Sequence, residues 1–74
     1  MSPFEQAYND HLAADQRWMD EIKRAFPHQW AGDVRYTDAA HGEPGTPLRA
    51  AYDEYLRTRG VWESFLHPRE RSAA

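Results

Sequence analysis

The sequence predicts an all-α protein, in which two amphipathic helices, about residues 3–26 and 47–66, form a helical hairpin. Three observations lead to this fold class. Apolar residues recur at three- and four-residue steps in both stretches, each stretch starts with a hydroxyl residue followed by proline, and prolines and glycines gather between them. With 74 residues the chain is long enough for one domain, which we place at residues 1–66, with residues 67–74 as a flexible tail.

The first helix has a clear start and end. Ser2, Pro3 and Glu5 form a capping box with proline at the first helical position. Pro27 stops the helix. Asp15 interrupts an apolar stripe whose other members are Phe4, Tyr8, His11, Leu12, Trp18, Met19, Ile22, Ala25 and Phe26.

Residues 27–46 connect the helices and hold two of the chain's five prolines and three of its four glycines. Residues 43–46 fit a type II turn, with proline second and glycine third. Because Trp30, Val34 and Tyr36 are too apolar for a free linker, we expect the connection to fold back over the helices. A short strand at 34–37 and a helical turn near 28–31 are both compatible with this segment.

The second helix starts at Thr46-Pro47, a cap followed by proline. Gly60 costs about 1 kcal/mol relative to alanine inside a helix, so the helix could end there, with 61–66 as a separate turn. The apolar stripe keeps its phase across Gly60, which favours one helix to residue 66. Its members are Leu48, Tyr52, Tyr55, Leu56, Trp62 and Leu66, with Arg59 among them.

Helix packing and assembly follow from these stripes. Antiparallel packing is the commoner result for consecutive helices, although the connection is long enough for parallel packing as well. A single helix pair seldom seals a core, so we expect a homodimer that completes a four-helix bundle. Asp15 and Arg59 lie on apolar stripes, and we expect them to pair within or between chains. We expect that four of the rings cannot all face one seam: Phe4, Trp18, Trp62 and Phe65.

The composition narrows the class of protein. Three Trp, four Tyr and three Phe indicate a core built from rings. Arginine greatly outnumbers lysine, which is typical of GC-rich genomes and suggests a bacterial or phage source. Without cysteine there is no disulfide and no thiolate metal site. Because no apolar run is long enough to span a membrane and no leader pattern is present, we expect a cytoplasmic protein.

The first helix carries one candidate metal site. His11 and Asp15 lie four residues apart, so both could reach one ion from one helix face. Further ligands would have to come from another histidine, and no spacing selects one. The sequence therefore predicts neither a metal nor a cofactor.

Carboxylate catalysis is not indicated either. The adjacent acids at 20–21 and 53–54 point to different helix faces, and each pair has an arginine at four-residue spacing, Arg24 for Asp20 and Arg57 for Asp53. This pattern is typical of solvated, charged helix faces. We predict that the protein is not an enzyme.

Binding functions remain. Arginines and rings alternate in residues 47–66 and the tail, which could bind nucleic acid, but acids are mixed into the same stretch and the net charge is −3. The same mixture suits protein contact better, because Trp, Tyr and Arg dominate binding hot spots. We predict a small helical protein–protein interaction module, such as an accessory regulator or a phage-encoded modulator of a host protein. The expected contact residues are Trp18, Trp30, Tyr55, Arg59 and Trp62.

Overall fold

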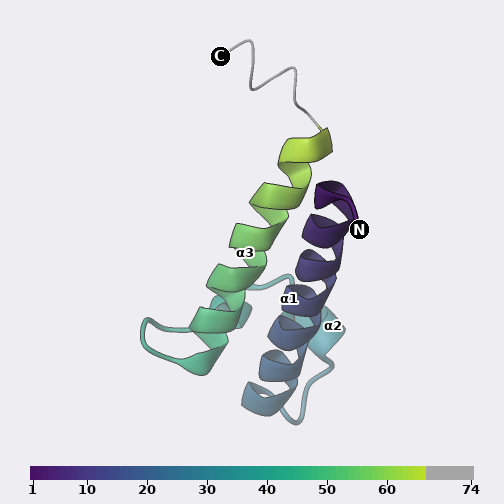
Figure 1. The fold of residues 1–74 in the computed structure, drawn as a ribbon. Helices are drawn as coiled ribbons and strands as arrows, with labels where there is room; N and C mark the ends of the chain where they lie inside the picture. Colours follow the sequence, from purple (N-terminus) through teal and green to yellow (C-terminus); the bar gives the residue numbers. More distant parts are fainter. Residues whose placement is uncertain (67–74) are drawn as a thin grey trace.

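The computed structural model describes residues 1–66 as an antiparallel helical hairpin with a short third layer (Figure 1). Its elements are α1 (Pro3–Ala25), α2 (Ala31–Val34), the 3-10 turn η1 (Asp38–His41) and α3 (Pro47–Leu66). The two long helices pack side by side, as predicted, and α2 lies behind their lower part in Figure 1. The tail predicted at 67–74 lies outside the described residues.

The start of α1 follows the predicted cap. The Glu5 amide donates to the Ser2 hydroxyl oxygen at 3.2 Å, and the Ser2 hydroxyl faces the Glu5 carboxylate at 3.2 Å. The return bond therefore joins two side chains, whereas a full capping box would use the Ser2 amide. At the other end, the Phe26 amide donates to the Ile22 carbonyl at 2.8 Å and closes the last turn. The helix ends within one residue of its predicted boundary.

The start of α3 also follows its predicted cap, and the helix continues through Gly60. The Arg49 amide donates to the Thr46 hydroxyl oxygen at 3.2 Å. In the preceding turn the Thr46 amide donates to the Glu43 carbonyl at 3.1 Å, and Gly45 has φ +88°, as the third position of a type II turn requires. The single helix to residue 66 is confirmed.

The connection folds back as expected, in a helical form. α2 begins one residue after Trp30, so the helical turn lies slightly later than predicted, and a strand at 34–37 is wrong, since residues 31–34 are helical and no strand occurs within residues 1–66. Gly42 ends η1 with φ +75°, and a Cβ there would lie 2.6 Å from the Arg49 backbone nitrogen. Only glycine allows the connection to approach α3 this closely.

The core lies where the third layer covers the hairpin. Its buried members come from all four elements: Trp18, Ile22, Ala31, Val34, Ala40, Leu48 and Ala51. We call this part the closed half. In the open half, residues 3–14 of α1 and 58–66 of α3, no third layer is present, and Phe4 and Phe65 stay 40% and 42% exposed. The fold thus has two layers at one end and three at the other.

Candidate interaction surface

Aromatic rings contact one another along the whole seam between α1 and α3. Phe4 meets Phe65 edge-on at 6.0 Å between ring centroids, and the Tyr8 and Trp62 centroids are 5.7 Å apart. The expectation that Phe4, Trp18, Trp62 and Phe65 cannot share one seam is therefore wrong. They fit because each occupies its own level of the antiparallel pair. In the closed half, Trp18 lies 4.6 Å from the Tyr55 ring.

Trp18 belongs to the core. It is 3% exposed, and its indole N–H donates to the Ala40 carbonyl at 2.9 Å. This bond ties α1 to η1 and satisfies both buried polar groups. A side chain so enclosed offers no surface to a partner, so we leave Trp18 out of the interaction surface.

Arg35, just after α2, is the polar centre of the closed half. Its Nη2 lies 2.7 Å from the Asp15 carboxylate, and its guanidinium carbon lies 4.9 Å from the Trp18 ring centroid. Burial acts to lower the pKa of Arg35, but the hydrogen bond and the charge of Asp15 outweigh it and raise that pKa. The guanidinium is thus held between a carboxylate and aromatic faces.

Within one chain the predicted Asp15–Arg59 contact is wrong, and its alternative, a contact between chains, stays a prediction. Asp15 pairs with Arg35, and Arg59 pairs with Glu63 on its own helix at 2.8 Å. The reason is the connection, which folds over the seam and brings Arg35 against Asp15. Arg59 lies in the open half, one helical turn from Glu63.

A groove of about 590 Å³ opens between α3 and the connection. It brings together three of the predicted contact residues, Tyr55, Arg59 and Trp62, with Trp18 at its floor. Tyr36, which is 85% exposed, stands at its edge and was missed from the sequence. From the sequence, Tyr36 was expected to fold back over the helices with the rest of the connection, and no pattern indicated that its ring stays exposed.

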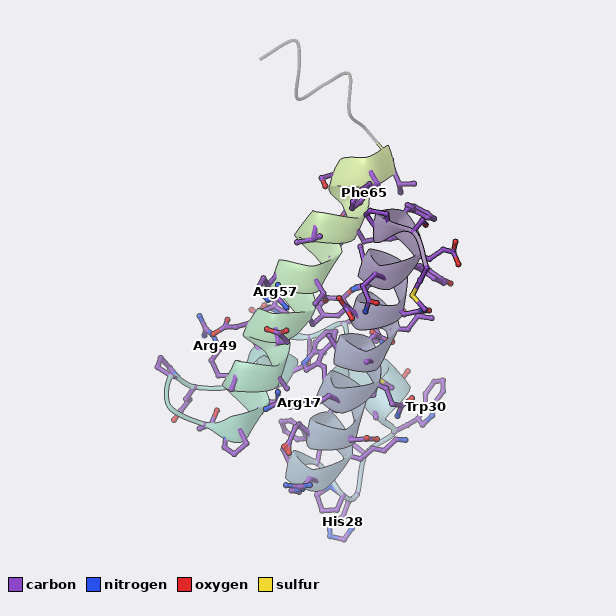
Figure 2. The ribbon with its side chains drawn as sticks, in the orientation of Figure 1. Arg17, His28, Trp30, Arg49, Arg57 and Phe65 are labelled. Carbon is purple, nitrogen blue, oxygen red and sulfur yellow. The ribbon has the colours of Figure 1, made fainter. Side chains whose placement is uncertain are left out.

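Trp30 lies apart from this groove. Its side chain is 73% exposed and, in Figure 2, projects outward beside α1, on the side away from α3. One side of the ring lies against the backbone of Gly32. A Cβ at Gly32 would come within 2.9 Å of the Trp30 ring carbon Cζ2. Trp30 is thus an exposed indole that packs on one side against Gly32.

The face of the hairpin opposite the connection is charged, with Arg17 and Arg57 toward the viewer in Figure 2. The ion pairs on the helices differ from the expected ones, Asp20–Arg24 and Asp53–Arg57. Arg24 pairs with Glu21 and Arg57 pairs with Glu54, three residues away in each case, and Asp53 pairs with Arg49, four residues away. Glu21 also departs from the expected solvated face, since it is only 9% exposed.

The histidine and aspartate considered for a metal site have other partners. His11 stacks on Trp62 and its Nδ1 lies 3.2 Å from the Thr58 hydroxyl. The Thr58 hydroxyl also lies 3.0 and 3.1 Å from the carbonyls of Glu54 and Tyr55. Asp15 binds Arg35. Among the residues described, no group of three histidine or acidic side chains is arranged to hold a metal ion.

The comparisons with known proteins add no relative. No protein-family model matches the chain, and neither a curated protein nor a solved structure is significantly similar to it. Within residues 1–66, no helix is both long and apolar enough to cross a membrane.

Proposed function

We propose that this chain is a non-enzymatic protein–protein interaction module that uses Trp30 as its anchor. The observation that carries the proposal is the combination of exposure and position: Trp30 is 73% exposed, and its ring lies against Gly32. A large ring in water contributes little to folding. A ring that packs against the chain on one side has fewer free orientations, and so loses less conformational entropy when it enters a pocket on a partner.

The segment that carries Trp30 supports this role. Ala31 and Val34 of α2 are buried at 4% exposure each, so the segment is fixed to the hairpin directly after the indole. The Val34 amide also donates to the Trp30 carbonyl at 3.2 Å. The partner would offer an apolar pocket deep enough for an indole, and a regulator that occupies another protein's surface would act in this way.

Nucleic-acid binding through α3 is the rival function. Phosphate binding needs basic side chains that are free to replace counterions. In the described part of α3, Arg49, Arg57 and Arg59 each pair with a carboxylate of the same helix. This pairing favours the protein-binding proposal over nucleic-acid binding.

The test is affinity capture from a lysate of the source organism, followed by mass spectrometry. The bait is the wild-type chain, Trp30→Ala or Tyr36→Ala, and the amount of captured partner is compared. Tyr36 is the matched control, because it is another highly exposed ring on the same connection. We expect Trp30→Ala to reduce capture at least ~10-fold, as for a hot-spot residue, and Tyr36→Ala to leave capture unchanged. Gly32→Ala, which displaces the ring without removing it, should weaken capture to an intermediate degree.

Circular dichroism of each variant checks that the fold is kept. Equal capture by wild type and Trp30→Ala would contradict the proposal, as would recovery of the bait alone. Nuclease-sensitive capture whose affinity falls steeply between 50 and 200 mM salt would instead support the nucleic-acid rival.

A further inference from the structure

We propose that a second copy of this chain docks on the uncovered part of the face that carries α2 and η1. We call this the open face, formed by Tyr8, Leu12, Leu56, Arg59, Trp62 and Leu66. It is separate from the Trp30 surface, so the inference goes beyond the proposed function. The result would be an antiparallel four-helix bundle of two open halves.

On α1, one side of the helix is covered only along half its length. Tyr8, Leu12, Asp15 and Met19 follow at steps of four, three and four residues, and therefore share a side. The connection covers the later two: Asp15 binds Arg35, and Met19 packs against the core. Tyr8 and Leu12 remain 42% and 47% exposed.

The same interruption occurs on α3. Tyr52, Tyr55, Arg59, Trp62 and Leu66 share one side by the same spacing. His41 of η1 stacks on Tyr52 at 4.3 Å, and Arg35 reaches the Tyr55 hydroxyl at 3.5 Å. Beyond Tyr55 the connection gives no cover, and Leu66 is 46% exposed. On both helices, the apolar stripe therefore continues beyond the third layer, which covers only about half of the stripe.

The exposed area matches what a dimer needs. Four open-face side chains are 42–47% exposed, and Tyr36 at the edge is 85% exposed. At about 150 Å² for each side chain, the lower end of the range for rings, these five residues leave roughly 400 Å² of mostly apolar surface in water. Since about 60% of an interface is apolar, this corresponds to about 650 Å² per partner, at the lower end of the range for stable protein interfaces.

The charges on this face favour a second copy over a charged partner. Arg59 and Glu63 lie side by side, 2.8 Å apart, and cancel one another. In a two-fold dimer the same patch faces itself, so Arg59 of one protomer can meet Glu63 of the other. In an antiparallel dimer, the two open halves, each about 18 Å long, lie against each other. The connection of each protomer then lies beyond the free end of its partner's open half.

The assembly is measured on the full-length chain by light scattering behind size exclusion, from about 1 to 200 µM protein. We expect a mass near 17 kDa, twice the 8.6 kDa of the chain, that falls on dilution. Leu12→Glu places a charge on the open face and should raise the dimer dissociation constant at least 30-fold. The matched control is Val61→Glu, because Val61 is similarly exposed at 44% and follows Glu54 and Arg57 on the opposite, charged side.

A charge exchange tests the proposed pairing across the two-fold axis. Arg59→Glu alone should dissociate the dimer through repulsion between acids, and the double variant Arg59→Glu, Glu63→Arg should restore it. A wild-type chain of 8.6 kDa at every concentration would overturn the proposal and leave the open face to a helix of another protein. Equal weakening by Leu12→Glu and Val61→Glu would also overturn it. Trp30→Ala should leave the dimer intact, which separates this result from the outcome for the proposed function.

Discussion

The closed and open halves are built from the same two helices but bury their side chains to different degrees. In the closed half, Ile22, Ala40 and Ala51 have no exposed surface. In the open half, Phe4 and Phe65 contact each other and still leave about two fifths of their surfaces in water, 40% and 42%. Their apolar stripes are alike, so the difference lies in the third layer.

The third layer covers the closed half because its buried side chains are short. These side chains are Ala31, Val34 and Ala40, and Ala51 lies opposite on α3, so the short helical turns approach the hairpin closely. The open half also has rings in contact, Phe4 with Phe65 and Tyr8 with Trp62, but no layer above them. Rings alone therefore do not produce a core; a chain segment that excludes water on the second side is also needed.

The largest effect that this comparison predicts is at Ile22. Ile22→Ala removes a fully buried side chain from the three-layer region and should lower the free energy of unfolding by about 3–4 kcal/mol. Val61→Ala, in the open half, should change it by less than about 0.5 kcal/mol, because Val61 is 44% exposed. Urea denaturation at one fixed protein concentration measures both. Similar losses at the two sites would show that the halves do not differ in packing.

A smaller effect concerns the ion pair that joins α1 to the connection. A double-mutant cycle of Asp15→Ala and Arg35→Ala should give a coupling free energy of about 1–2 kcal/mol, because the two side chains are partly buried and in direct contact. The same cycle with Arg59→Ala in place of Arg35→Ala should be additive within about 0.5 kcal/mol. If the second cycle showed the larger coupling, the assignment of Arg35 as the partner of Asp15 would fail.

The smallest effect, and the only gain, is expected in the open half at Gly60. A Cβ there meets nothing within 4 Å, so Gly60→Ala should stabilise α3 by about 0.5–1 kcal/mol. For a chain of this size, that is a rise in Tm of roughly 2–8 °C in a thermal scan. Gly42→Ala is the contrast in the closed half. Its positive φ and the nearby Arg49 backbone predict a loss of stability, and a gain there would contradict the close approach.

The parts of the fold that local chemistry controls could be predicted from the sequence. Caps, prolines and the three- and four-residue spacing defined both long helices to within a residue, and the stripe carried α3 through Gly60. The type II turn followed from the order of proline and glycine alone. Each of these features depends on residues close together in the chain.

The candidate surface could be predicted only in part, because it depends on where the connection lies. Trp18 and Trp30 were both expected to contact a partner, yet the connection buries one and exposes the other. Asp15 has a basic partner, as expected. The helical periodicity indicated only Arg59, on the stripe of the facing helix, because Arg35 lies in the connection, where no period is present. The helical form of the connection was likewise one of two alternatives, since four-residue elements have too few positions to show a period.

The fold also has a consequence for the order in which its contacts close. In the closed half, Asp15 meets Arg35 and Trp18 meets Ala40 across only 20 and 22 residues of chain. In the open half, His11 meets Thr58 across 47 residues. Longer loops lose more entropy on closure, so the connection end is the natural starting point for folding and the hairpin closes from there toward its free ends. The last contacts to form are also the first to open, which makes amide hydrogen exchange fastest at the ends of α1 and α3 where Phe4 meets Phe65.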